Sequence, residues 1–162
     1  MTTAEQVREV LAEVYDPEIP VLTIEDLGVL RDVSVDGEHV VVTVTPTYSG
    51  CPAMDEIRAD IAGALAAHGW DDVEVRTVLA PAWTTEWMSD DGRRKLREHG
   101  IAPPGELLLQ IRPFGAGAGA GVTCPQCGSS DTEELTRFGS TSCKALWRCR
   151  SCREPFDHFK AH

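Results

Sequence analysis

Two Cys-x-x-Cys units near the C-terminal end constrain this 162-residue chain more than any other feature. They are Cys124-Pro-Gln-Cys127 and Cys149-Arg-Ser-Cys152, and 21 residues separate them. Each CxxC turn directs two sulfur atoms toward one point, and two such turns joined by a β-hairpin complete a tetrahedral four-thiolate shell. Because protein sulfurs fill all four positions, the spacing predicts a closed, structural zinc site in a C-terminal zinc ribbon.

The six cysteines could instead form disulfides or redox pairs, so the expected compartment matters. The N-terminal sequence MTTAEQVREV lacks the basic and apolar regions of a signal peptide. No stretch approaches the roughly 18 consecutive apolar residues of a membrane span. We therefore expect a cytoplasmic protein outside the membrane, where paired CxxC units more often bind metal than form disulfides. Rubredoxin-like iron fits the same four-sulfur shell, but zinc is the expected occupant.

Acidic charge is concentrated ahead of the cysteine module. Residues 1–114 carry 21 acidic and 9 basic side chains, a net charge of −12, whereas residues 115–162 carry 5 and 6, a net charge of +1. Four thiolates around a divalent cation would make this tail about two charges more negative. An acidic body repels phosphate backbones, and a ribbon that reads DNA or RNA would be basic. Nucleic acid is therefore not an expected partner.

A run of glycine and alanine marks the division between domains. Residues 115–121 read GAGAGAG, and a segment of this composition cannot pack a core. We expect an N-terminal domain over residues 1–114, a flexible linker over residues 115–121 and the zinc ribbon over residues 122–162.

Hydrophobic periodicity in the N-terminal domain predicts a small α+β fold. Apolar residues at helical spacing indicate one helix from Val7 to Val14, ended by Asp16-Pro17, and a second from Met54 to about Gly69. Alternating apolar residues and the turn signal Asp36-Gly37 indicate strands. The expected strands cover residues 29–35, 39–45, 73–78 and 107–111, and a shorter helix covers residues 93–98. Together they predict a mixed sheet with helices on one face.

Cys51 is a candidate functional thiol. It precedes Pro52, which suits the first position of a helix, so Cys51 is expected at or beside the helix N-cap. Free backbone N–H groups and the helix dipole favour a thiolate there, although Asp55 and Glu56 oppose it. The alternative is a buried thiol that acts as a small hydrophobic side chain.

Several other side chains could have either a functional or a purely structural role. Cys143 is surplus to a four-ligand zinc shell and could be a packed thiol or a further ligand. Asp16 and Glu18 could do acid–base or metal chemistry, or could cap a solvated turn. Trp83 and Trp87 could cover the core or form an interface patch. No nucleophile elbow, phosphate-binding loop or dinucleotide fingerprint is present.

Several segments together resemble one family. DPEIPVLTIEDLGVLRDV, VTPTYSGCPAMDEI and LAPAWTTEWMSDDGRRKLREHGIAPP are similar to the small domain of SufT-like iron–sulfur assembly factors. The C-terminal CPQCGSSDTEELTRFGSTSCKALWRCRSCREPFDHFK resembles the zinc-ribbon extension of PaaD, the accessory subunit of the phenylacetyl-CoA epoxidase system. The two matches cover nearly the whole chain. They differ from the PaaD pattern at the end, where His162 stands and relatives often carry a further cysteine.

The resemblance implies a role in aerobic bacterial phenylacetate breakdown. There, the oxygenase has a di-iron subunit and a reductase that carries flavin and a 2Fe–2S cluster. A PaaD-type subunit is expected to help mature or insert clusters, with that reductase as the expected client, rather than to catalyse epoxidation itself. The resemblance places the family's reactive cysteine on Cys51, its acidic loop on Asp16 and Glu18 and its threonine loop on Thr47. Cys143 falls in the PaaD-type ribbon segment.

Two hypotheses of different classes follow. In the first, the protein is a non-catalytic assembly factor with a structural zinc, and Cys51, with or without Cys143, transiently holds iron or an iron–sulfur cluster. Its partners are then the cluster-bearing reductase, other epoxidase subunits and the iron–sulfur assembly machinery. In the second, the protein is a structural or catalytic subunit of the oxygenase itself. The Glu-x-x-His spacing of a di-iron site is absent from the sequence, which disfavours a catalytic role.

Overall fold

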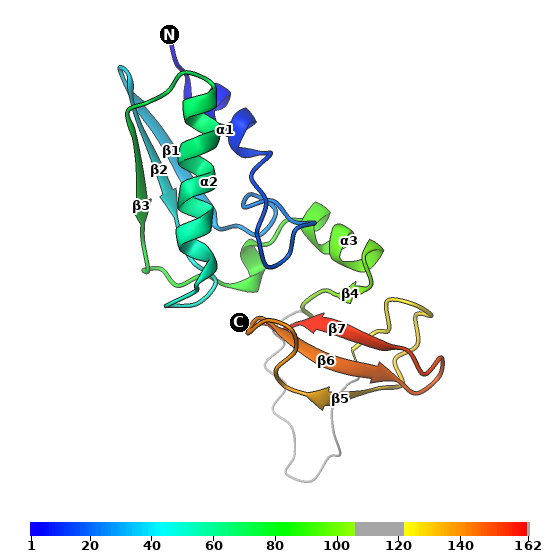
Figure 1. Ribbon diagram of the computed structural model, residues 1–162. Coiled ribbons are helices and arrows are strands. Elements are labelled where there is room, and N and C mark those ends of the chain that lie inside the picture. Colours follow the sequence, from blue (N-terminus) through cyan, green and yellow to red (C-terminus); the bar gives the residue numbers. More distant parts are fainter. Residues whose placement is uncertain (106–121, 162) are drawn as a thin grey trace. The chain divides into compact units, whose positions relative to one another are not determined.

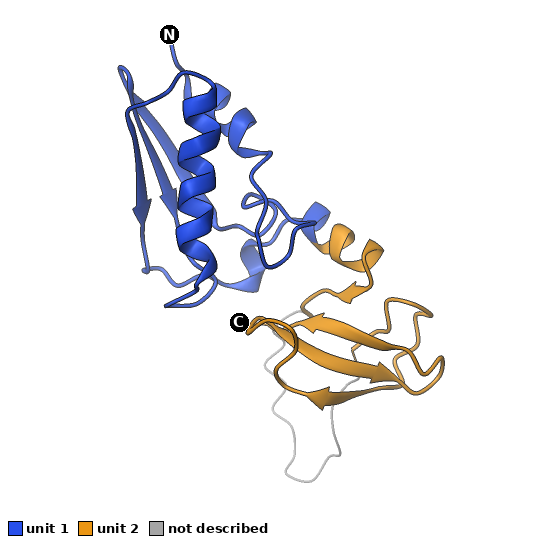
Figure 2. Cartoon of the chain, viewed as in Figure 1, with its two compact units in different colours: residues 1–92 blue, residues 93–162 orange. Residues whose placement is uncertain are grey.

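The computed structural model describes residues 1–105 and 122–161. The chain divides into two compact units, Met1–Gly92 and Arg93–His162 (Figure 2). The linker expected at residues 115–121 and the strand expected at residues 107–111 lie outside the described residues. Among the residues that are described, no helix has the length and apolar character needed to cross a membrane.

The first unit is a three-stranded mixed sheet with two helices. The strand order is β1-β2-β3, in which β1 and β2 are antiparallel and β2 and β3 are parallel. A two-residue turn that begins at Gly37 joins β1 to β2, whereas α2 forms the crossover between the parallel pair. The elements are α1 (Ala4–Leu11), β1 (Leu30–Asp36), β2 (His39–Val44), α2 (Ala53–Ala67) and β3 (Val73–Thr77).

Both helices of this unit cover the same face of the sheet (Figure 1). Alternate residues of β2 point into the core, so Val40, Val42 and Val44 are all fully buried. Apolar residues spaced by three or four along the helices pack over them, namely Val7, Leu11, Ile57, Ile61 and Leu65. The predicted α+β class, with helices on one face of a small mixed sheet, is confirmed.

Helix α1 ends earlier than the sequence pattern predicts. Thr3 and Gln6 form a capping box at its start, but its last residue is Leu11 rather than a residue next to Asp16-Pro17. The residues that follow Leu11 form a loop that folds back on itself. The amide of Asp16 donates to the carbonyl of Leu22 (2.9 Å), and the amide of Ile24 donates to the carbonyl of Val14 (2.9 Å). These non-local hydrogen bonds replace further helical turns, so Val14 is buried without being helical.

The two tryptophans of residues 83–87 cover the core of the first unit. The indole of Trp83 is buried, and its Nε1 donates to the carbonyl of Leu27 (2.8 Å). Trp87 lies at the end of a short 3-10 helix, Thr85–Trp87, directly against Gly28. The guanidinium of Arg31 lies 3.6 Å from the centroid of the Trp87 ring. These contacts tie this segment to the loop before β1 and support the core interpretation of both tryptophans.

The second unit is built around a four-stranded sheet. Its strand order is β4-β7-β6-β5, in which β4 is parallel to β7 and the other neighbours are antiparallel. The elements are β4 (Ile101–Ala102), β5 (Thr132–Thr136), β6 (Lys144–Cys149) and β7 (Pro155–Phe159). Helix α3 (Asp90–Glu98) precedes β4, and its acidic first turn and basic last turn suit the helix dipole. The short strand β4 was not predicted, and it places Ile101 opposite Asp157 of the ribbon.

Candidate functional site

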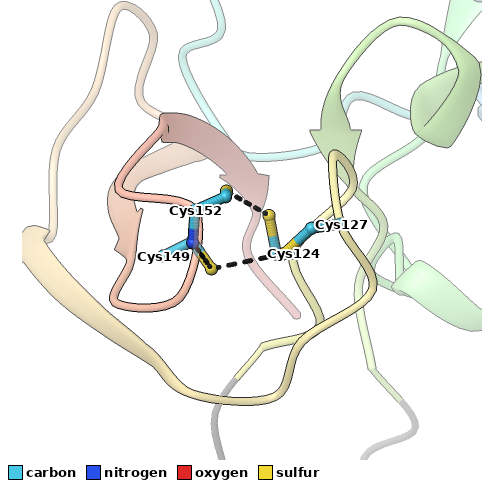
Figure 3. Close-up of side chains that lie close together, drawn as sticks. All are labelled: Cys124, Cys127, Cys149 and Cys152. Carbon is cyan, nitrogen blue, oxygen red and sulfur yellow. Dashed lines mark hydrogen bonds between the residues drawn. The ribbon is translucent and has the colours of Figure 1, made fainter.

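The four cysteines of the two CxxC units converge on one point. The Sγ atoms of Cys124 and Cys152 are 3.8 Å apart, and those of Cys127 and Cys149 are 3.6 Å apart (Figure 3). All four sulfurs lie within 4.8 Å of one another. Zinc–sulfur bonds of about 2.3 Å on a tetrahedron separate the sulfurs by about 3.8 Å. A disulfide needs about 2.05 Å, so these are free thiols arranged for a single metal ion.

The backbone of each CxxC turn supports its first sulfur. The amide of Gln126 donates to Cys124 Sγ (3.4 Å), and the amide of Cys152 donates to Cys149 Sγ (3.5 Å). Each turn ends on a residue with positive φ: Gly128 at 76° in the first, and Arg153 at 67° in the second. Glycine adopts this conformation freely, whereas arginine there is strained, so closure of the second turn carries a conformational cost.

Without a metal, the thiols of Cys149 and Cys152 do not lose their protons together. The amide of Cys152 is the chief cause that lowers the pKa of Cys149 to about 6. The amide of Glu154 lowers the pKa of Cys152, but burial and hydrogen bonds shared with the other thiols outweigh it and raise that pKa to about 12. A bound divalent cation would stabilise all four thiolates and release the remaining protons. The donor set therefore fits a closed zinc site.

Two of the four cysteines also belong to the core of the ribbon. Cys124 and Cys149 are buried and cluster with Ala102 and Phe156. Val122, Trp147 and Cys152 pack against this cluster and are partly buried. This cluster is small for the core of a folded module, and metal coordination would supply additional stability.

Cys51 lies outside this tetrad, in the first unit, in the turn that leads into α2. Its amide donates to the carbonyl of Tyr48 (3.3 Å), and its carbonyl accepts from the amide of Met54 (3.2 Å). Pro52 is the N-cap of α2 rather than its first helical residue, which is Ala53. Cys51 therefore lies beside the cap, as expected, with its thiol half-buried.

The environment of Cys51 favours the thiol over the thiolate, contrary to the expectation from the helix dipole. Burial is the largest influence and raises the pKa of Cys51, and the carboxylates of Glu18 and Asp16 raise it further. Hydrogen bonds from the Ala53 amide and the Tyr48 hydroxyl act in the opposite direction but do not prevail. Metal binding at Cys51 would have to displace its proton, and the two hydrogen-bond donors are placed to stabilise the thiolate that forms.

Sequence reasoning did not single out Tyr48 as a partner of Cys51. Its position three residues before the cysteine, in a segment rich in Gly, Ser and Pro, is a turn signal that could have found it.

The two carboxylates of the acidic loop lie in different surroundings. Asp16 is buried, and its Oδ1 accepts from the amides of Glu18 (2.8 Å) and Ile19 (2.9 Å), which closes the turn. Glu18 is half-buried and acts electrostatically on Cys51. Thr47 lies half-buried in the loop before Cys51. Among the described residues, only the cysteine tetrad brings three or more potential metal ligands together, so this loop is not a preassembled metal site.

Cys143 lies in the second unit and is not part of the tetrad. Its side chain is buried, and its Sγ lies 3.0 Å from Oγ1 of Thr141. Its carbonyl accepts from the amide of Lys160 (2.9 Å), which joins the start of β6 to the end of β7. These contacts favour the packed-thiol interpretation.

Two protein families match separate parts of the chain. A family described as "Iron-sulfur cluster assembly protein" matches residues 4–77, and one described as "PaaD zinc beta ribbon domain" matches residues 112–160. A relative from Escherichia coli K12, named as a subunit of a "Putative 1,2-phenylacetyl-CoA epoxidase", is 49% identical over 96% of this chain and 93% of its own length. A "Fe-S protein maturation auxiliary factor" from Porphyromonas gingivalis is 35% identical over 59% of this chain and 92% of its own.

Solved structures show the same fold in the N-terminal part. A domain of unknown function from Bacillus anthracis matches with a TM-score of 0.54 and 31% identity, over 57% of this chain and 90% of that chain. A conserved hypothetical protein from Thermotoga maritima matches with a TM-score of 0.51 and 34% identity, over 59% and 94%. The fold and the cysteine tetrad thus define an iron–sulfur assembly domain joined to a zinc β-ribbon. The chain belongs to the PaaD family.

Proposed function

We propose that this protein is a non-catalytic accessory factor of aerobic phenylacetate breakdown that assists iron–sulfur cluster assembly or insertion. The names of its relatives support both parts of the proposal. The Escherichia coli relative is named as an epoxidase subunit, and the Porphyromonas relative as a maturation factor for Fe-S proteins. The client that we propose is the 2Fe–2S reductase of the phenylacetyl-CoA epoxidase.

The observation that carries the proposal is the Cys51 thiol. It lies outside the structural tetrad, is half-buried beside Glu18 and Asp16, and has hydrogen-bond donors in Tyr48 and Ala53. In the step that we propose, the thiol proton leaves to water or to a neighbouring carboxylate. The sulfur then replaces one ligand of the incoming iron or cluster iron, a water molecule or a thiolate of the donor, and that ligand departs to solvent or stays with the donor. Because the pKa of Cys51 is raised, protons compete with iron for the sulfur, so release of iron is coupled to reprotonation of the thiol.

The four-cysteine site has a different role in this scheme. Its protein sulfurs leave no coordination position for a substrate, so we assign it to structure and to the presentation of the ribbon surface. Cys143 is buried beside Thr141 and is proposed as a packing residue with no ligand role.

The test is the iron and sulfide content of the reductase when it is co-expressed with wild type or with Cys51→Ser. Serine nearly matches the size of cysteine but is a poor ligand for iron. We therefore expect cluster occupancy to fall several-fold, while the stability of the variant stays within about 1 kcal/mol of wild type. Cys143→Ser is the matched control and should leave occupancy unchanged. Full cluster occupancy of the reductase with Cys51→Ser would show that Cys51 is a structural thiol and would contradict the proposal.

The alternative function is a structural or catalytic subunit of the oxygenase, which the name of the Escherichia coli relative favours. Co-purification separates the two functions. An assembly factor should associate with the reductase and leave once the cluster is inserted. A subunit should remain with the purified oxygenase in a constant ratio, and its removal should abolish turnover by an already matured complex.

A further inference from the structure

An open groove of about 430 Å³ lies on the first unit, and none of the residues assigned above lines it. Helix α1 and the turn after it supply one wall, and the residues that follow α2 supply the other. The lining residues combine carboxylates, an aromatic ring and one aliphatic side chain. They are Gln6, Glu9, Val10, Glu13, His68 and Trp70.

The wall formed by α1 presents two carboxylates. Glu9 and Glu13 are exposed and lie four residues apart, on one side of the helix and its C-terminal extension. Neither makes an ion pair within the part of the chain that the structure describes. The single arginine of α1, Arg8, is instead directed to Asp32 of β1 (3.8 Å). The rest of the first unit does not neutralise the charges of Glu9 and Glu13 either, because residues 1–92 hold 19 acidic and 4 basic side chains.

The opposite wall is a fixed aromatic surface. Nε1 of Trp70 donates to Oγ1 of Thr2 (3.0 Å), and the ring stacks on His68 at a centroid distance of 6.0 Å. Nδ1 of His68 lies 2.9 Å from the carbonyl of Ala64, which fixes that ring in turn. A ring held in place in this way can receive a cation on its exposed face with little loss of side-chain entropy.

We propose that this groove binds an arginine- or lysine-bearing segment of a partner protein. A cationic side chain would lie along Val10, place its charge between Glu9 and Glu13, and contact the indole of Trp70. Arginine fits best, because a guanidinium can pair with a carboxylate and stack on an indole together. A metal ion does not fit, since no three-ligand cluster occurs here among the described residues. Nucleic acid is excluded by the net charge of −15. The inference does not depend on the role of Cys51.

The test uses the full chain labelled with ¹⁵N and follows the indole N–H signal of Trp70, identified by its loss in Trp70→Phe. The probe is a blocked, alanine-rich dodecapeptide with two arginines four residues apart, which matches the spacing of Glu9 and Glu13. The reference peptide carries citrulline at both positions, which keeps the shape of arginine and removes the charge. We expect a saturable shift of the Trp70 signal with the arginine peptide and none with the citrulline peptide. Equal shifts with both peptides, or no shift with either, would overturn the proposal.

Paired variants then separate this groove from general attraction to an acidic surface. Glu9→Gln/Glu13→Gln should weaken peptide binding about tenfold, because two ion pairs are lost. Glu38→Gln/Asp60→Asn removes the same charge from exposed positions outside the groove and should change the affinity by less than about twofold. Equal weakening by both pairs contradicts the proposal. For wild type, raising the salt from tens to hundreds of millimolar should weaken binding, and salt-independent binding would also contradict it.

Discussion

Gly28 couples the loop before β1 to a segment nearly sixty residues later in the chain. Its φ is 76°, and a Cβ added there would lie 2.5 Å from the carbonyl oxygen of Trp87. Gly28→Ala therefore combines backbone strain with overpacking, and we expect the free energy of unfolding to fall by about 2–4 kcal/mol. Urea denaturation followed by tryptophan fluorescence measures this change.

The control for Gly28 is Gly37, in the turn between β1 and β2. It also has positive φ, at 64°, but nothing lies within 4 Å of an added Cβ. Gly37→Ala should therefore cost only the backbone strain of about 1 kcal/mol. If the two variants were equally destabilised, the contact with Trp87 would have no energetic importance.

His39 provides a pH-dependent link between β2 and the start of β3. Its Nδ1 lies 2.9 Å from Oδ1 of Asp72, and this hydrogen bond is the main cause that raises the pKa of His39 above its usual 6.5. A raised pKa means that the stabilisation is present below pH 6.5 and is lost as the pH rises through the folded-state pKa. Wild type should therefore exceed His39→Gln in melting temperature at pH 5.5, and the difference should shrink by pH 8.5. A difference that is constant with pH would show that the imidazolium pairing contributes nothing.

At the scale of elements, the ribbon should depend on its metal. We expect about one zinc per chain by elemental analysis. Cys124→Ser should lose the zinc and unfold β5, β6 and β7, because about 10 kcal/mol of binding energy in such sites is also folding energy. Zinc should also be released in acid, since the thiolates must then be protonated.

The matched control is Cys143→Ser, which changes a buried cysteine of the same module without touching the tetrad. It should retain the zinc and the dispersed amide spectrum of a folded ribbon. A Cys124→Ser variant that is metal-free and still folded would contradict the structural assignment of the site.

At the scale of the whole molecule, we expect the first unit to fold alone. It has its own sheet, two covering helices and a continuous apolar core. A chain that ends at Gly92 should therefore unfold cooperatively in urea. A chain that ends at Phe114 should have nearly the same midpoint, because β4 has lost its partner β7 and adds no sheet pairing. A broad, non-cooperative transition for both chains would mean that the ribbon completes the core.

The sequence alone determined the features that depend on local pattern. The spacing of four cysteines specifies a tetrahedral site, because each CxxC turn brings two sulfurs together by itself. Alternating valines in residues 39–45 and the Asp36-Gly37 signal specify a half-buried hairpin, since side-chain direction and turn preference are set by near neighbours. The periodic apolar face of residues 54–65 specifies α2 in the same way.

Only the tertiary structure decided the features that depend on distant residues. Helix α1 stops at Leu11 because the loop that follows pairs with itself, and β4 exists because β7 lies beside it. The protonated state of Cys51 follows from burial and from carboxylates more than thirty residues earlier in the chain. Trp70 reaches Thr2 across 68 residues to fix one wall of the groove. The local sequence pattern cannot predict these contacts, because they form only when the packed core brings separate segments together.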